Sequence, residues 1–262
     1  MNTILKTTVL LFAIAFTTSQ TIAFSNSNDI SPLIKVLIVV TSHEKMGNTD
    51  KKTGYYLSEV THPYFKFSEA GFAIDIASPK GGKSPMDKSS HDLKDKDNKR
   101  FLEDKKLMAL IENTIPLNKV NPDDYSAIFF AGGHGTMWDF PSNKIINDIT
   151  ASIYEKGGVV AAVCHGPAAL VDVKLSNNKY LIEGKSVTSF TNAEESAVKL
   201  TKTMPFPLES KLVERGATFK GARMWQNNVV VSERIVTGQN PASASSVGKA
   251  VVKLLTKKNN SK

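Results

Sequence analysis

The stretch GGVVAAVCHGPAAL, at residues 157–170, decides the fold of this chain. Its apolar part, 159–163, is a short run typical of a strand that is buried on both faces of a sheet. Small residues then lead through Gly166 into a helix, and Cys164 stands at the turn. A side chain at such a turn projects above the carboxyl ends of parallel strands, where open sheets bind their ligands. The stretch therefore predicts a nucleophile elbow in an α/β sheet.

The segments on either side continue this alternation of strands and helices. The expected strands are 35–41, 72–77, 125–130, 159–163 and 186–189, and the expected helices are 55–70, 101–113, 145–155 and one that opens at Gly166. A hairpin at 229–232 and 235–237 and a closing helix at 242–256 follow, whereas 79–98 is expected to be a long surface loop. We therefore predict a single α/β domain over 35–257, a doubly wound, mostly parallel sheet with helices on both faces, in a flavodoxin-like sandwich.

The N-terminal residues predict export. Lys6 precedes an apolar run at 7–16, and small and polar residues follow up to Ala23, which is the pattern of a signal peptide. The run is shorter than the roughly 20 residues of a spanning helix, so we expect no integral membrane domain, although an uncleaved anchor stays open as an alternative. We therefore expect a signal peptide at 1–23, short tails at 24–34 and 258–262, and a periplasmic or secreted location.

The composition does not point to nucleic acid as a partner. The formal net charge is +8, but the lysines are spread along the chain and alternate with acids at 87–106, which indicates a solvated surface. The chain shows no nucleic-acid-binding motif. It has one cysteine, Cys164, so no internal disulfide can form. A single thiol is unusual in an exported protein and directs attention to that residue.

Cys164 is the candidate nucleophile. The amino end of the expected helix would lower the pKa of its thiol and offer backbone N–H donors. The alternative is that Cys164 is only a small buried hydrophobic residue. The sequence Cys-His-Gly-Pro at 164–167 favours the functional interpretation.

A second glycine-rich turn follows the expected strand 125–130. If the two turns lie side by side, the amides near Gly133 and His165 would hold a developing oxyanion beside the sulfur. Glycines also simply make turns, so this turn alone is weak evidence. No Gly-Lys-Ser or Gly-Lys-Thr follows it, which excludes a phosphate-binding loop.

Several segments together resemble the DJ/PfpI superfamily, which has the class I glutamine-amidotransferase-like architecture. Beyond the elbow, these segments are AGGHGTMWDFP (131–141), LIEGKSVT (181–188), FTNAEE (190–195), PFPLE (205–209) and TGQNPAS (237–243). The resemblance extends roughly from Lys35 to Leu255. The combination is similar to the heat-shock chaperone and glyoxalase III branch.

The resemblance implies roles for side chains that are far apart in the sequence. Glu59 matches a glutamate near the start of the first helix, where a carboxyl beside the thiol would have a raised pKa and could shuttle a proton. Taken alone, Glu59 would be a solvated helix residue. His165 needs a carboxylate to orient its ring, and Glu195 matches that partner, with Glu194 as the alternative. The other interpretation of His165 is a plain turn residue.

The resemblance also implies a pocket beside the nucleophile. Its expected lining is Gly132, Gly133 and His134, and Trp138 with Phe140 is expected to wall it, although Trp138 could equally be a core aromatic residue. Some relatives carry a metal site, but the other histidines of this chain show no ligand spacing, and we predict no metal. These other histidines are His43, His62 and His91.

As the resemblance implies, the expected reaction is a cofactor-free conversion of methylglyoxal or glyoxal to D-lactate or glycolate by a glyoxalase III-like lyase of the D-lactate dehydratase type. The Cys164 thiolate would add to the small reactive aldehyde as a hemithioacetal. The alternatives are a holding chaperone, a protein deglycase, and a cysteine peptidase or amidase. A homodimer is an expectation from the superfamily. A sulfinic acid at Cys164 would reflect damage or redox sensing.

Overall fold

A computed structural model describes residues 34–259. The predicted signal peptide at 1–23, nearly all of the tail at 24–34 and the last three positions of the tail at 258–262 lie outside the described residues. The boundaries that we expect for the domain, 35–257, stay a prediction.

The sequence of buried strands forms a seven-stranded sheet in the order β3-β2-β1-β4-β5-β9-β8. Every neighbouring pair is parallel except β8 and β9, which form an antiparallel hairpin. The bounds of these strands are Lys35–Val39 (β1), Ala73–Ser78 (β2), Ile115–Pro116 (β3), Ala127–Phe130 (β4), Val159–Val163 (β5), Val229–Ser232 (β8) and Ile235–Gly238 (β9). The chain builds β1 to β3 in one direction and then returns to place β4 on the other side of β1, and open sheets bind ligands at such a reversal.

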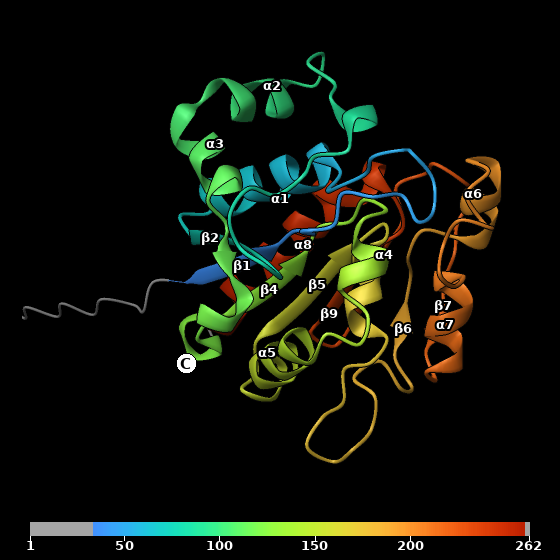
Figure 1. The fold of residues 1–262 in the computed structure, drawn as a ribbon. Coiled ribbons are helices and arrows are strands. Elements are labelled where there is room, and N and C mark those ends of the chain that lie inside the picture. Colours follow the sequence, from blue (N-terminus) through green and yellow to red (C-terminus); the bar gives the residue numbers. More distant parts are fainter. Residues whose placement is uncertain (1–33, 260–262) are drawn as a thin grey trace, which may run out of the picture. The chain divides into compact units, whose positions relative to one another are not determined.

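Helices cover both faces of the sheet (Figure 1). The face that holds Val36 and Ile38 packs under α1 (Leu57–Glu69), α2 (Lys96–Glu103), α3 (Lys105–Glu112) and α8 (Ala244–Asn259). The opposite face, with Leu37 and Val39, packs against α4 (Thr136–Asp139) and α5 (Lys144–Glu155). Successive strand residues point to opposite faces, so a fully apolar strand supplies two cores at once. The predicted fold class, including the flavodoxin-like sandwich in one domain, is confirmed.

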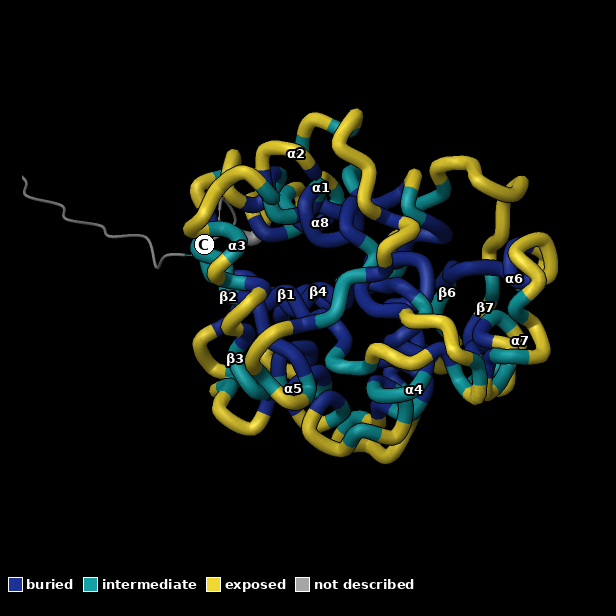
Figure 2. The backbone as a smooth tube through the Cα atoms, turned by 45° about the horizontal axis from the view of Figure 1, so that its top comes forward, coloured by how far each residue is buried: buried dark blue, intermediate teal, exposed yellow. Residues whose placement is uncertain are grey.

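The buried strands and the exposed surface separate clearly in Figure 2, where β1 and β4 lie among dark blue segments and the outer loops are exposed. All side chains of 36–39 are inaccessible to solvent. Within residues 34–259, we find no helix of the length and apolar character that crossing a membrane demands.

Some elements differ from the prediction. The helix expected at 101–113 is two helices, because Asp104 ends α2 and its side chain accepts hydrogen bonds from the first amides of α3. Part of the loop expected at 79–98 is helical, with a short 3₁₀ turn at Lys88–Ser90 and the start of α2. The helix expected to open at Gly166 is a five-residue 3₁₀ turn, Gly166–Leu170.

The strand expected at 186–189 does not join the main sheet. Its ordered part, β6 (Ser186–Val187), pairs with β7 (Thr218–Phe219) in a separate two-stranded sheet, since β9 takes the position beside β5. Two further helices, α6 (Asn192–Ala197) and α7 (Leu208–Glu214), belong to this region and were not predicted. Helix α6 begins with a capping box from Thr191 and Glu194.

Candidate active site

Cys164 occupies a strained turn at the carboxyl end of β5. Its φ is 61°, in the left-handed region that costs a residue with a side chain about 1–3 kcal/mol. The turn is fastened on both sides, because the Cys164 amide donates to the Gly238 carbonyl at 2.9 Å and the Phe190 amide donates to the Cys164 carbonyl at 2.8 Å. A Cβ at Gly166 would lie 2.3 Å from the Phe130 carbonyl oxygen, so only glycine fits there. These contacts fix the position of the sulfur. Cys164 is buried, with 3% of the residue exposed.

Glu59 is a completely buried carboxyl in the first turn of α1. Its Oε2 accepts a hydrogen bond from the Gly132 amide at 2.8 Å. Its Oε1 has no hydrogen-bond partner within the described part of the chain. The carboxyl group also interacts with the thiol of Cys164. Burial raises the pKa of Glu59 to about 8, although the hydrogen bonds with Cys164 and Gly132 oppose the shift. Glu59 is therefore mostly a neutral acid at pH 7.

The expectation of a lowered thiol pKa at Cys164 is wrong. Burial, followed by the charge of Glu59, raises the pKa of the thiol above its ordinary value, and the amide of His165 opposes this only in part. The turn that follows Cys164 is a short 3₁₀ segment rather than an α-helix, so it offers little of the expected dipole. Two acids this close do not both ionise, and the pair of Glu59 and Cys164 holds at least one proton at neutral pH.

His165 is a buried, neutral base that faces the sulfur. Its Nδ1 lies 3.4 Å from Sγ of Cys164, and its Nε2 lies 2.7 Å from Oε2 of Glu195. Burial, followed by the charge of His134, lowers the pKa of His165 to about 4. Because an ionised carboxylate only accepts hydrogen bonds, Nε2 of His165 carries the ring proton. Nδ1 is then free to accept a proton from the thiol.

Glu195 is the carboxylate that fixes this tautomer. Burial alone would raise its pKa, but hydrogen bonds from His134 and then His165 outweigh burial and lower the pKa to about 2. The His134 contact joins Nε2 to Oε1 at 3.1 Å. Glu194, the alternative partner, instead accepts hydrogen bonds from the Trp225 amide and from Asn240. The structure thus brings Glu195, not Glu194, to the ring of His165.

A cavity of about 490 Å³ opens beside these groups. Of the residues predicted to line it, Gly133 and His134 do so. Gly132 does not, because its amide is used by Glu59 and its Cα is packed so closely that a Cβ would lie 2.6 Å from the Glu59 carboxylate. Among the described contacts the amides of Gly133 and His165 have no backbone or side-chain oxygen partner, but the His165 amide hydrogen-bonds to the sulfur of Cys164. The Gly133 amide is therefore open to a ligand oxygen, whereas the His165 amide would have to turn from the sulfur to reach one.

Trp138 does not line the cavity, and this prediction is wrong. Its ring stacks on His43, with centroids 5.1 Å apart, and packs against the core on the α5 side. Phe140 is likewise buried in that core, against Phe130. The aromatic walls are other residues, which the sequence interpretation missed. These are Tyr56, Phe190 and Trp225.

A set of possible metal ligands also lies here. The ligand atoms of His134, His165 and Glu195 lie within 4.8 Å of one another, a donor set that suits Zn²⁺. The prediction of no metal considered other histidines and did not foresee this set. In the structure the two imidazole nitrogens already donate to the carboxylate. A bound ion would have to replace these hydrogen bonds.

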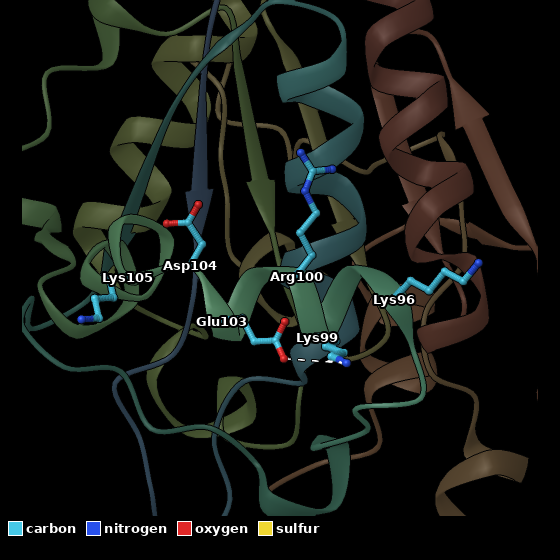
Figure 3. A pocket seen from close by; sticks show the side chains of 6 residues that line it. All are labelled: Lys96, Lys99, Arg100, Glu103, Asp104 and Lys105. Atoms are coloured by element: carbon cyan, nitrogen blue, oxygen red, sulfur yellow. Dashed lines mark ion pairs between the residues drawn. The ribbon is translucent and has the colours of Figure 1, made fainter.

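A second hollow lies over α2 and α3, away from this chemistry. Its lining residues are Lys96, Lys99, Arg100, Glu103, Asp104 and Lys105, which point in different directions in Figure 3. Lys99 pairs with Glu103 at 3.8 Å, and the Arg100 guanidinium lies over the Phe65 ring at 4.2 Å. Diverging charges of both signs do not form a binding site for one ligand.

The comparisons with known proteins agree with this geometry. Residues 52–254 match the model of the DJ-1/PfpI family. The chain belongs to this family. In line with that, the superfamily and the glyoxalase III branch predicted from the motifs are confirmed.

Curated relatives and solved structures cover nearly the whole of the family domain. "Glyoxalase 3" of Candida albicans is 33% identical over 84% of this chain and 98% of its own length. "Glutathione-independent glyoxalase HSP31" of Saccharomyces cerevisiae is 37% identical over 81% of this chain and 94% of its own length. The structure of Rapid Encystment Protein 24 KDa of Francisella tularensis superposes with a TM-score of 0.83 at 47% identity, covering 85% of this chain and 99% of that protein. The crystal structure of glyoxalase III from Candida albicans superposes with a TM-score of 0.80 at 32% identity. The match covers 85% of this chain and 98% of that protein.

These relatives contradict the predicted signal peptide and periplasmic location. The curated relatives given above are yeast proteins named as glyoxalases, and a signal peptide with a periplasmic address conflicts with that kinship. An apolar run that is bounded by Lys6 and small residues is therefore an insufficient criterion for a signal peptide, and we withdraw that prediction. The comparisons do not test where the protein is located.

Proposed function

We propose that this protein is a glutathione-independent glyoxalase of the lyase type, which converts methylglyoxal to D-lactate and glyoxal to glycolate with Cys164 as its nucleophile. The observation that carries the proposal is the contact of 3.4 Å between Sγ and Nδ1 of a neutral, oriented His165. The buried acid Glu59 adjoins the same sulfur. The curated relatives at 33% and 37% identity, both named as glyoxalases, support this assignment.

In the first step the thiol adds to the aldehyde. The Sγ–C bond forms, Nδ1 of His165 takes the thiol proton, and the carbonyl oxygen receives a proton to give a hemithioacetal. The amide of Gly133, and that of His165 once it turns from the sulfur, are the donors that would stabilise the oxygen as its charge develops. The raised pKa of Cys164 makes this base necessary, because little thiolate is present before the proton is removed.

The second step moves hydrogen between the two carbons. A base removes the proton from the carbon that carries sulfur, and the neighbouring carbon receives a proton, so that the first carbon is oxidised to a thioester and the second is reduced to an alcohol. Glu59 suits this transfer, because a group with a pKa of about 8 both gives and takes a proton near neutral pH. Water then cleaves the thioester, releases the hydroxy acid and restores the thiol. The net reaction adds one water.

The direct test is product identification with and without the sulfur. Purified protein is incubated with methylglyoxal, and the product is followed by NMR. We expect lactate from the wild type and a loss of turnover of about 1,000-fold or more in Cys164→Ser, since a hydroxyl is a far weaker nucleophile. Undiminished lactate formation by Cys164→Ser, or no lactate from the wild type, would reject the proposal.

A further inference from the structure

The cavity beside Cys164 has a mixed lining. The proposed reaction takes place at Cys164, His165, Gly133 and His134. The rest of the lining is polar at Asp87, Ser89 and Asn240, aromatic at Tyr56, Phe190 and Trp225, and otherwise apolar at Val198, Pro241 and Ala242. Methylglyoxal is small enough to occupy the space beside Cys164 alone, whereas cavities of about 300–1,000 Å³ enclose most of a drug-sized ligand. At about 490 Å³, this cavity has space that methylglyoxal leaves unused.

Trp225 is a half-exposed aromatic residue of the cavity lining. Its ring lies 5.7 Å from that of Phe190, which in turn lies 4.5 Å from the ring of His165. Trp225 is 48% exposed and lies in an otherwise exposed stretch, 220–227. Its φ is 65°, which is rare for a bulky residue and persists only where the surroundings enforce it. Trp225 therefore presents a half-exposed ring to the cavity from a backbone conformation that its surroundings must maintain.

The enforcing contact is Glu194. This completely buried carboxylate accepts hydrogen bonds at Oε1 from the Trp225 amide at 2.9 Å, from Gln239 at 3.1 Å and from Asn240 at 2.8 Å. Gln239 also accepts from the Ala222 amide at 2.8 Å. These hydrogen bonds hold the loop in place, and its indole lines the cavity. The two adjacent glutamates have different roles. Glu194 positions the loop of Trp225, and Glu195 orients His165.

We propose that Phe190 and Trp225 form an apolar subsite that selects 2-oxoaldehydes carrying an aromatic or large apolar substituent. This inference rests on the proposed function. Aromatic rings gain from stacked or edge-on contacts beyond the area they bury, and the subsite offers two such rings. With phenylglyoxal as the probe, the aldehyde carbon binds to Sγ and is oxidised, the ketone carbon is reduced, one water is added, and the product is mandelate.

The experiment compares kcat/KM for phenylglyoxal and methylglyoxal in three proteins: the wild type, Trp225→Ala and Met224→Ala. Met224 is the matched control, because it is the neighbouring exposed apolar residue and does not line the cavity. We expect the wild type to prefer phenylglyoxal about tenfold or more. In Trp225→Ala this ratio should fall about tenfold, mainly through a higher KM for phenylglyoxal, and in Met224→Ala it should hold within about twofold.

The outcomes separate the inference from the function it rests on. Methylglyoxal turnover without a preference for phenylglyoxal overturns the subsite and leaves the proposed function standing. Turnover of neither aldehyde overturns both. An equal fall of the ratio in Trp225→Ala and Met224→Ala also overturns the subsite, because the loop as a whole rather than the indole would then be responsible.

A binding measurement keeps the inference testable if Trp225→Ala does not fold. The chain has two tryptophans, so Trp225 is the only one left in Trp138→Phe. We expect mandelate, the aromatic product, to quench the emission of Trp225 saturably, with a Kd at least about tenfold below that of lactate. Equal quenching by the two hydroxy acids would overturn the subsite.

Discussion

Glu59 and Glu195 are two buried glutamates at the same site, and their pKa values are displaced in opposite directions. Glu195 accepts hydrogen bonds from two imidazole rings, which lower its pKa to about 2. Glu59 has one backbone donor and the thiol of Cys164 as its only hydrogen-bonding neighbours, so burial prevails and raises its pKa to about 8. Burial opposes the charge of both carboxyls, and only Glu195, which is slightly less buried, has enough hydrogen-bond donors to outweigh it. Environments that separate two such pKa values assign the roles, with Glu59 as the proton carrier and Glu195 as the fixed charge.

The largest effect is expected when Glu59 loses its ability to carry a proton, which tests its role in the contrast with Glu195. Glu59→Gln keeps the size of the side chain and an acceptor for the Gly132 amide, but an amide does not exchange protons. We expect kcat for methylglyoxal to fall about 1,000-fold, within the range of general acid–base catalysis. Steady-state kinetics measures this, with Glu69→Gln, an exposed acid at the end of the same helix, as the control. A loss below about tenfold would show that Glu59 does not move the proton.

Glu195→Gln tests the other side of the comparison and has a smaller expected effect. A glutamine offers one acceptor oxygen in place of a carboxylate that accepts from two histidines. Its amide group would face one ring and favour the wrong tautomer of His165. We expect kcat to fall about 100-fold, as for a reacting group that is slightly misplaced. If KM alone rises and kcat is retained, the carboxylate orients the substrate rather than His165.

The two carboxyls also predict opposite dependences of stability on pH. The pKa of Glu59 is higher in the folded chain, so its favourable contribution is fully present below about pH 4.5 and is lost as the pH rises through 8. The pKa of Glu195 is lower in the folded chain, so its contribution is present above about 4.5 and is lost as the pH falls through 2.

Urea unfolding of the wild type and of Glu59→Gln between pH 5 and 9 checks the first of these windows. The free energy of unfolding of the wild type should fall relative to the variant as the pH rises, by a few kcal/mol in total, since each unit of pKa shift corresponds to about 1.4 kcal/mol. A difference between the two proteins that stays constant over this range would mean that Glu59 has an ordinary pKa.

Much of the fold could be predicted because its strands are apolar on both faces. The strand predicted at 159–163 is β5 to the residue, and the helix predicted at 145–155 is α5 with one residue added. Topology was harder to predict, because the pairing of β6 with β7 instead of the main sheet depends on contacts that no local pattern contains. The break at Asp104 was a local signal, a capping aspartate, that the longer helical pattern concealed.

The residues of the candidate site could be predicted from the sequence only in part. Cys164 could be found from the turn itself, but Glu59 and Glu195 lie far from it in sequence and came from the resemblance alone. Expecting Trp138 in the wall was wrong, because a matching motif does not say which way its aromatic side chain points, and Trp225 was not considered. The available signal for Trp225 was its position in a polar stretch, where a buried tryptophan is not expected. The pKa of the thiol depended on burial and on the kind of helix after the turn, and neither is visible in the sequence.

The smallest effect on activity is expected from substitution of His134, which contacts Glu195 and influences the pKa of both Glu195 and His165. Its charge lowers the pKa of His165, and its hydrogen bond lowers the pKa of Glu195. His134→Gln keeps a donor for Glu195 but removes the charge, so the pKa of His165 should rise. Activity should then fall off at a higher pH on the acid side, because a protonated His165 does not accept the thiol proton. At pH 7 we expect a loss of less than about tenfold, since His165 stays mostly neutral there.

A pH profile of kcat/KM measures this shift, and His134→Leu is the informative partner because it removes both the charge and the donor. If the acid limb moves in His134→Leu but not in His134→Gln, the hydrogen bond to Glu195 controls His165, and the charge of His134 does not. If the limb moves equally in both, the charge is sufficient. The pair therefore separates the two ways in which one histidine can maintain the contrast between a neutral base and a charged carboxylate 2.7 Å apart.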